Sequence, residues 1–187
     1  MEDYNSNALD PEFLINIPSN YPLVGKGVDG AVYRLSENTC IKIYFEQKKA
    51  KAEIKAYIAI QGSKMFPQFY GSGPKYIIIE YIEGESLKHY LENHRTISES
   101  IAKQLLTILQ EIKRCGFTRI DASLRHILVN QHEELKFIDH VHAFEYDQSR
   151  PKHLFSSLED LHLLKPFIEL VKVLDLKTYK EWKKLEK

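Results

Sequence analysis

Residues 21–45 read YPLVGKGVDGAVYRLSENTCIKIYF and contain three short runs of strand-forming residues. A glycine-rich turn separates the first run from the second, and the dipeptide Glu37-Asn38 separates the second from the third. Strands joined by such short connections pair in an antiparallel way, because a parallel pair needs a much longer crossover. The segment therefore predicts a three-stranded antiparallel meander.

The next segments predict one helix and two further strands. We expect the helix over residues 46–62, which read EQKKAKAEIKAYIAIQG. Strands are expected over 66–73 and 76–82, where FPQFYGSG and YIIIEYI are rich in aromatic and β-branched residues. Together with the meander they predict a five-stranded antiparallel sheet, and Glu83 and Gly84 then form a linker.

The second half of the chain predicts mainly helices. We expect helices over 85–94 and 96–117, the second one opened by a capping box from Thr96 to Glu99 and apolar along one face. Two short strands, ILVN and LKFID, follow before further helices reach the end. This order predicts an α+β protein: a polar leader over 1–20, a small β-rich lobe over 21–82, and a reduced helical lobe over 83–187.

The composition restricts the possible partners. The chain has 26 basic and 26 acidic residues, and this balance argues against nucleic acid or an anionic membrane as the main partner. The most apolar short run, YIIIEYI, is far shorter than a membrane span, and the acidic start MEDYNSNALD does not resemble a signal peptide. With two cysteines outside any metal-binding pattern, a cytoplasmic protein with reduced thiols is expected.

The glycine-rich turn has the spacing G-x-G-x-x-G-x-V, formed by Gly25, Gly27, Gly30 and Val32. Glycines allow backbone N–H groups to approach phosphate oxygens, since no Cβ blocks the approach. A strand rather than a helix follows the glycines, which excludes the dinucleotide-binding arrangement and favours a flap over phosphates. A hairpin turn without any ligand is the alternative interpretation.

Lys42 lies in the middle of the predicted third strand, between Ile41 and Ile43. A lysine is seldom placed there unless it points to water or has a charged partner. Glu53 in the following helix is a candidate partner. The alternative is a solvated edge lysine beside an acid on the helix surface.

With these residues in this order, the chain resembles proteins of the protein-kinase-like fold, in a minimal form similar to RIO-type and other small atypical kinases. The resemblance covers roughly residues 21 to 165. The resemblance implies that the glycine-rich turn covers the phosphates of ATP and that Lys42 holds the α- and β-phosphates, with Glu53 positioning it. It further implies that Ile79 stands beside the adenine site and that Glu80 to Ile82 offer backbone hydrogen bonds to adenine.

The same resemblance gives roles to two aspartates. Asp121 in RIDASLRHILVN matches the catalytic base of kinases, and Asp139 in LKFIDHVHAF matches the aspartate that binds Mg²⁺. A carboxylate near the acceptor hydroxyl orients it and accepts its proton, while the second carboxylate fixes magnesium against the phosphates. Without the resemblance, Asp121 is a turn or cap residue and Asp139 is an acid at a strand end.

The chain departs from the kinase pattern at several positions. Arg119 and Ile120 replace the usual His-Arg pair, and His140 begins a His-Val sequence in place of Phe-Gly. His126 occupies the place of a magnesium-binding asparagine, although neutral imidazole is a poor ligand for Mg²⁺. A histidine at this place is similar to the catalytic loop of lipopolysaccharide heptose kinases. Asp160 is a candidate for the helix aspartate that ties down the catalytic loop, or a plain surface acid.

The resulting expectation is an ATP- and Mg²⁺-dependent phosphotransferase, a serine/threonine-type protein kinase of a small atypical kind. A pseudokinase that regulates a partner is the first alternative, motivated by Arg119, His126 and His140. A kinase that acts on a small molecule or sugar is the second. The sequence does not identify the acceptor, the oligomeric state or the physiological partner.

Overall fold

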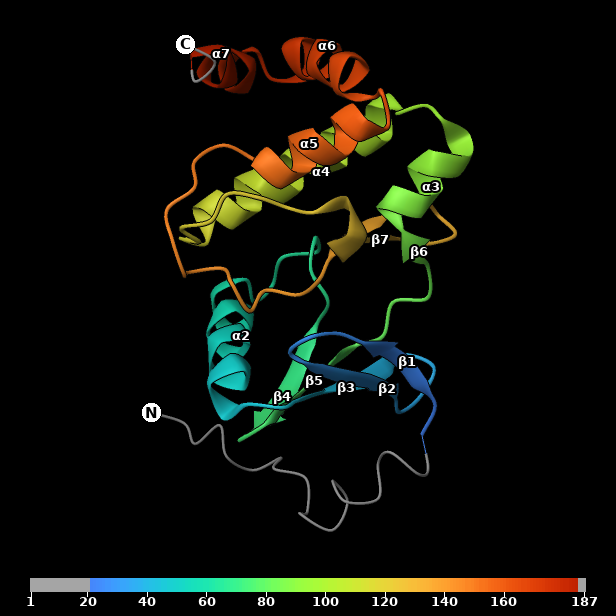
Figure 1. Cartoon of the computed structure of the whole chain (residues 1–187), viewed down its shortest axis with the longest axis vertical. Coiled ribbons are helices and arrows are strands. Elements are labelled where there is room, and N and C mark those ends of the chain that lie inside the picture. Colours follow the sequence, from blue (N-terminus) through green and yellow to red (C-terminus); the bar gives the residue numbers. More distant parts are fainter. Residues whose placement is uncertain (1–20, 185–187) are drawn as a thin grey trace.

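The computed structural model describes residues 21–184, so the predicted leader over 1–20 and residues 185–187 lie outside the described part. Figure 1 shows a sheet with one helix at one end of the molecule and a group of helices at the other. The structure is a mixed α+β arrangement with a five-stranded antiparallel sheet and, over the described residues, six α-helices. The expected α+β class and the five-stranded sheet are therefore confirmed.

The five-stranded sheet has the order β1-β2-β3-β5-β4, with every neighbouring pair antiparallel. Its strands are β1 Leu23–Lys26, β2 Gly30–Arg34, β3 Thr39–Tyr44, β4 Phe69–Gly73 and β5 Tyr76–Glu80. The composition of β3 suits its central position, because the side chains of Cys40, Ile41 and Tyr44 are all buried there. A central strand is held on both sides, so side chains on β3 are placed precisely.

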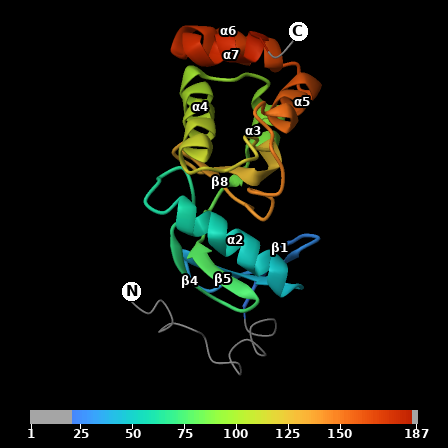
Figure 2. The same ribbon diagram turned by 90° about the vertical axis from the view of Figure 1, so that its left-hand side faces the viewer.

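Helix α2, Gln47–Ala59, packs across one face of this sheet against β3, β4 and β5 (Figure 2). The residues of α2 that are buried are Ala50, Glu53, Ala56 and Tyr57, which recur at helical spacing on one side. Three of these four are small or apolar, as expected for a face that covers a sheet. Glu53 is the exception, and a carboxylate in such a place needs partners.

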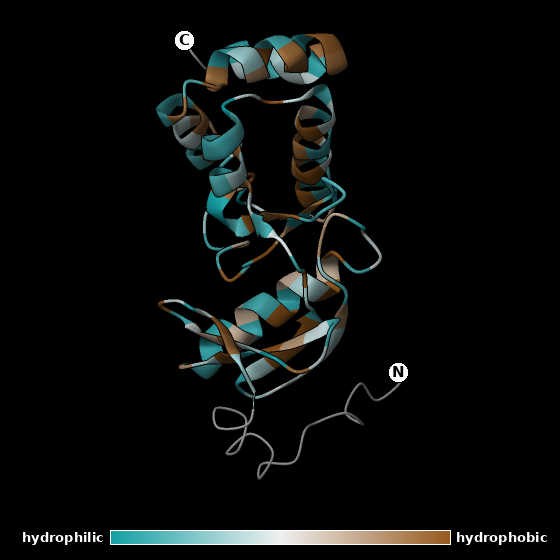
Figure 3. Ribbon diagram, turned by 90° about the vertical axis from the view of Figure 1, so that its right-hand side faces the viewer, coloured by the Kyte–Doolittle hydropathy of each residue, from teal (hydrophilic) through white to brown (hydrophobic). Residues whose placement is uncertain are grey.

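Helix α4, Glu99–Arg114, is the longest helix of the helical half and contacts α6 and β8. Its apolar residues recur along the ribbon (Figure 3), and seven of them are buried: Ile101, Ala102, Leu105, Leu106, Ile108, Leu109 and Ile112. The predicted capping box from Thr96 is wrong. Ser98 is the cap, and its Oγ accepts a hydrogen bond of 3.2 Å from the Ile101 amide, because a serine directly before the first turn reaches the free N–H groups.

A second, three-stranded sheet has the order β6-β7-β8 and lies between the first sheet and the helices (Figure 1). Its strands are β6 Glu85–Ser86, β7 Ile127–Val129 and β8 Leu135–Phe137, and a 3₁₀ turn at Leu124–His126 precedes β7. The prediction of a helix from residue 85 is wrong by two residues, since Glu85 pairs with Val129 before the helix starts.

The remaining helices are α3 Leu87–His94, α5 Lys152–Asp160, α6 Leu164–Leu174 and α7 Leu176–Lys184. Trp182 of α7 packs edge-on against Phe155 of α5 with ring centres 4.9 Å apart. The last helix therefore packs against another helix of the same half. None of the helices between residues 21 and 184 has the length and apolar character needed to cross a membrane.

Candidate functional site

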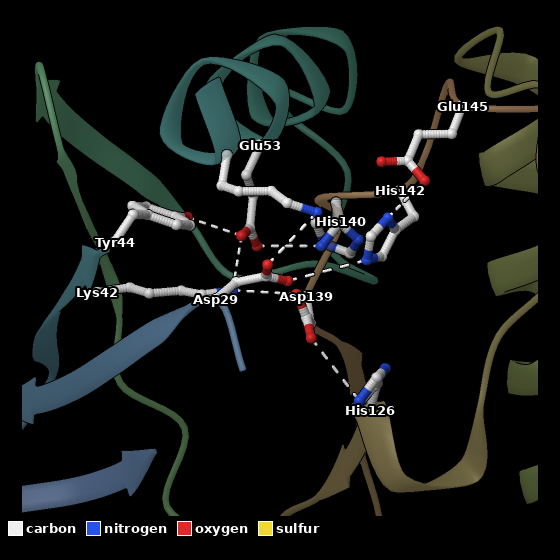
Figure 4. A network of polar contacts seen from close by, with 10 residues as sticks. Asp29, Lys42, Tyr44, Glu53, His126, Asp139, His140, His142 and Glu145 are labelled. Atoms are coloured by element: carbon white, nitrogen blue, oxygen red, sulfur yellow. Dashed lines mark hydrogen bonds and ion pairs between the residues drawn. The ribbon is translucent and has the colours of Figure 1, made fainter. Parts of the chain in front are cut away.

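Lys42 connects the two halves of the molecule. Its Nζ lies 2.6 Å from Oε2 of Glu53 on α2 and 3.0 Å from Oδ1 of Asp139, which follows β8 (Figure 4). Burial alone would lower the pKa of Lys42, but the two carboxylates outweigh it and the pKa is raised. The lysine therefore stays protonated, and Glu53, the partner predicted from the sequence, is one of the two carboxylates that it contacts.

Glu53 is buried, with 1% of its surface exposed, and its carboxylate is fully hydrogen-bonded. Besides Lys42, the Tyr44 hydroxyl donates to Oε2 over 2.7 Å and the His140 amide donates to Oε1 over 3.0 Å. Burial, followed by the Glu53 charge, raises the pKa of the Tyr44 hydroxyl, so Tyr44 acts as a donor. Tyr44 was not among the site residues predicted from the sequence, although it lies two residues after Lys42 and therefore on the same face of β3.

Asp139 is held in an unusual backbone conformation. Its φ is 64°, in the left-handed region that few residues other than glycine adopt. Burial raises its pKa, but the Lys42 charge and hydrogen bond and the nearby His126 outweigh this effect, and the net pKa is lowered. The carboxylate is therefore ionised, one third of the side chain remains exposed, and a strained conformation of this kind is typical of functional sites.

His126 stands next to Asp139 from the other side. Its Nε2 lies 3.7 Å from Oδ2 of Asp139, and 46% of the side chain is exposed. Burial lowers the pKa of His126; Asp139 opposes this, and Lys42, Arg125 and Arg119 lower it further. Neutral imidazole is the favoured form, which suits a neighbour of the carboxylate better than a ligand of Mg²⁺.

The His140 side chain points away from the site into an aromatic cluster. Its ring makes edge-on contacts with Tyr57 at 5.2 Å, Phe66 at 5.3 Å and Phe137 at 4.8 Å between ring centres. Burial lowers the pKa of this histidine to about 3, so the ring is neutral. His140 thus packs as an aromatic residue, and its replacement of phenylalanine leaves the apolar packing behind Asp139 intact.

Asp121 contacts the start of α5. Its carboxylate accepts hydrogen bonds from the side-chain amide of Gln148 at 2.5 Å and from the backbone amides of His153 at 3.0 Å and Leu154 at 3.2 Å. Although Asp121 borders a cavity, 0% of its side chain is exposed. In this conformation the carboxylate anchors a helix N-terminus, where negative charge is stabilised, and the role of base stays a prediction. Asp160, at the far end of α5, is exposed, as a surface acid would be.

The glycine-rich turn joins β1 to β2, and the Gly27 amide donates to the Gly30 carbonyl over 2.9 Å. A Cβ on Gly30 would lie 2.1 Å from the Ile43 carbonyl oxygen, whereas one on Gly27 or Gly25 would meet no backbone atom. Gly30 is therefore required by the sheet itself. Val32 pairs with Lys42 across β2 and β3, so their side chains share one face.

The same turn is attached to its surroundings through Asp29. Its carboxylate lies 3.4 Å from Nζ of Lys49 on α2 and 3.8 Å from Nε2 of His142, which follows the aspartate of the site (Figure 4). His142 in turn has its Nδ1 2.6 Å from Glu145. These contacts hold the glycine-rich turn near the loop after β8.

The segment Glu80–Ile82, predicted to contact adenine, connects the two halves. The Tyr81 amide donates to the Asn38 carbonyl over 2.9 Å, and the Glu80 carboxylate is occupied by Lys136 at 3.1 Å. The Ile82 amide has no hydrogen bond to another group of the described chain. A backbone donor at this place is available to a ligand.

A cavity of about 170 Å³ lies beside Asp139, and all of its lining residues fall between Phe117 and His153. Its lining includes Arg119, Arg125, His126, His142 and His153. In the sequence, Arg119 stood out only as a departure from a motif, and no local pattern indicated that Arg119 and Arg125 line one cavity with several histidines. Over residues 21–184, no group of three or more histidine, cysteine, aspartate or glutamate side chains is arranged to hold a metal ion.

The fold and the site define a mixed α+β protein in which a lysine of the sheet bridges a buried glutamate and a partly exposed aspartate, an arrangement compatible with a small kinase-like fold. A protein of Bacillus subtilis (strain 168) named "Putative serine/threonine-protein kinase YrzF" is 29% identical to this chain over 122 residues. The match covers 63% of this chain and 57% of that protein. It supports a kinase-like relationship weakly, and no family model matches the chain.

Proposed function

We propose that this protein is an ATP-dependent phosphotransferase of the serine/threonine kinase type. The observation that carries the proposal is the position of Lys42, whose ammonium group bridges Glu53 and Asp139 at 2.6 and 3.0 Å. A cation held this firmly provides a fixed positive charge for phosphate oxygens, and phosphoryl transfer depends mainly on such positioning and charge stabilisation.

The residues around the lysine support the same chemistry. Glu53 would orient Lys42, the glycine-rich turn with Gly25, Gly27 and Gly30 would cover the phosphates beside Val32, and the free amide of Ile82 would donate to adenine next to the carbonyl of Glu80. Each of these roles is part of the proposal. A Cβ at Gly27 would meet nothing within 4 Å, and the Ile82 amide has no hydrogen bond to another group between residues 21 and 184, so both positions are open to a ligand.

Asp139 is the residue suited to hold Mg²⁺. Its carboxylate is ionised and partly exposed, and protein sites for Mg²⁺ often use one or two carboxylates, with phosphates and water as the other ligands. Bound there, the ion would neutralise phosphate charge. His126 fits this role poorly because imidazole is a weak ligand for Mg²⁺, and it is better suited to contact Asp139 from the side.

A calorimetric titration of ATP, with and without Mg²⁺, tests the proposal. We expect magnesium-dependent binding by the wild type, its loss in Asp139→Asn, and its retention in Asp160→Asn, which removes an exposed acid from α5. Circular dichroism checks that each variant is folded. An ATP affinity that changes neither with Mg²⁺ nor with the Asp139→Asn substitution would refute the assignment.

A second candidate function is a pseudokinase that binds nucleotide or a partner without transfer. The burial of Asp121 favours it, because a carboxylate occupied by Gln148 and the start of α5 does not reach an acceptor hydroxyl. Conversion of ATP to ADP over hours, compared between the wild type and Asp139→Asn, separates the two. Binding of Mg²⁺–ATP with no turnover above that of the variant would favour the pseudokinase.

A further inference from the structure

The cavity beside Asp139 belongs entirely to the second half of the molecule. Its walls come from segments between Phe117 and His153, and neither Lys42 nor the glycine-rich turn lines it. Figure 4 shows Asp139 between Lys42 on one side and His126, which lines the cavity, on the other. A ligand in this cavity would therefore meet the aspartate from the side opposite to the nucleotide phosphates.

The charges of the cavity do not balance. Two carboxylates border it, but Asp139 is paired with Lys42 and Asp121 is buried against the amides of α5. The two guanidinium groups, Arg119 and Arg125, have no ion pair with a carboxylate in the part of the chain that the structure describes. These two guanidinium groups give the cavity positive charge that an anionic ligand would neutralise.

Contacts with its neighbours hold Arg119 in place before any ligand binds. Its backbone amide donates to the Ala143 carbonyl over 3.2 Å, its strand segment pairs with Gln148, and its guanidinium lies 5.4 Å from the centre of the Tyr146 ring. The Nε atom of Arg119 is buried and has no hydrogen-bond partner among the described residues. A buried donor without a partner is costly, and a ligand that accepts from it would remove that cost.

We propose that this cavity binds a phosphate group carried by the acceptor, with Arg119 and Arg125 as the residues that recognise it. The inference rests on the proposed function and narrows its substrate to a compact phosphorylated compound that also carries a hydroxyl. Guanidinium groups bind phosphate through paired hydrogen bonds. A phosphomonoester carries about −1.5 to −2 charges at neutral pH, which matches the two guanidinium groups better than the single charge of a carboxylate ligand does.

The size of the cavity agrees with such a ligand. A single water molecule needs about 10–15 Å³ of cavity volume, measured as the space open to the centre of a water-sized sphere. By the same measure this cavity has about 170 Å³, which accommodates a group of several atoms. In the transfer, the acceptor hydroxyl oxygen bonds to the γ-phosphorus while the bond to the bridging oxygen of ATP breaks. That electron pair leaves with ADP, and the hydroxyl proton passes to water.

Titration of inorganic phosphate into the protein, without nucleotide or metal, tests the site directly. We expect wild-type binding to weaken about tenfold or more in Arg119→Gln and in Arg125→Gln, since each loses a charge-assisted hydrogen bond. Arg119→Lys, which keeps the charge but loses the paired donors, should fall in between. Arg95→Gln, which removes an arginine at the end of α3, is the matched control and should bind as the wild type does.

The inference is overturned if the wild type does not bind phosphate, if acetate binds as tightly as phosphate, or if only Lys42→Met weakens the binding. Should Arg119→Gln fail to fold, the exposed Arg125 carries the test. Mg²⁺–ATP binding, measured on the same samples, separates the two proposals. Phosphate binding without ATP binding would support this site and refute the kinase assignment, whereas ATP binding without phosphate binding would refute this site alone.

Discussion

The Nζ of Lys42 and Oδ1 of Asp139 lie 3.0 Å apart, although 97 positions separate them in the chain. The lysine comes from the central strand of the sheet and the aspartate from the loop after β8. Their contact fixes the sheet and the helical half against each other at the point where the site lies. Glu53 completes the cluster and makes it sensitive to the loss of any one member.

Replacing Lys42 by methionine should destabilise the protein by about 3 kcal/mol or more, because it leaves the buried Glu53 carboxylate without its cation. Urea unfolding followed by circular dichroism measures this change. The double variant Lys42→Met with Glu53→Gln should recover part of the loss, since it removes the unpaired charge.

Lys48→Met provides the control for that prediction. It breaks a contact of 2.8 Å with Glu46, but both side chains of this pair are more than half exposed. The midpoint of urea unfolding should not move. An equal loss of stability in Lys42→Met and Lys48→Met would show that the buried cluster does not stabilise the fold.

Asp121 should matter for stability through α5, whatever its role in chemistry. Asp121→Ala leaves the amides of His153 and Leu154 without their acceptor, and we expect a loss of about 2 kcal/mol or more. Hydrogen exchange should accelerate at these two amides. Asp175→Ala is the matched comparison, because Asp175 accepts from the Thr178 amide at the start of α7 and its loss should loosen α7 while α5 stays protected. Unchanged exchange at α5 in Asp121→Ala would contradict the anchoring role.

The contact between Lys42 and Glu53 could be predicted from the sequence because a lysine in the middle of an apolar strand needs a partner, and the next helix offers an acid on its buried face. Asp139 was placed only through a resemblance. The direction of the Asp121 carboxylate could not be predicted, since it depends on where α5 begins, much later in the chain. The gathering of Arg119 and Arg125 is likewise a tertiary feature without a local pattern, as is the pairing that makes Glu85 part of a strand.

The glycines of the turn should separate structural from ligand effects. Gly30→Ala places a Cβ against the Ile43 carbonyl and should cost about 1–3 kcal/mol by forcing β2 and β3 apart. Gly27→Ala meets nothing within 4 Å and should change stability by less than about 0.5 kcal/mol. If the turn covers phosphates, Gly27→Ala should still weaken ATP binding in calorimetry. Equal thermal midpoints for the two variants would contradict the close approach at Gly30.

His140 makes stability depend on pH in a defined direction. Its pKa is about 3 in the folded protein, because of burial, and near 6.5 in the unfolded chain. Between these values the unfolded chain binds a proton that the folded protein does not. The contribution is therefore fully present above about pH 6.5 and is lost as the pH falls towards 3, with a slope of up to about 1.4 kcal/mol per pH unit.

His140→Phe should remove this slope, since phenylalanine fits the aromatic cluster of Tyr57, Phe66 and Phe137 and does not titrate. Urea unfolding of the wild type and the variant between pH 7 and pH 4.5, without metal or nucleotide, measures it. The free energies of unfolding should diverge in favour of the variant as the pH falls, because every other titrating group is common to both proteins. His132→Gln, at an exposed turn, should follow the wild type. Parallel curves for the wild type and His140→Phe would mean that His140 binds its proton equally well in the folded and the unfolded protein, which its apolar surroundings argue against.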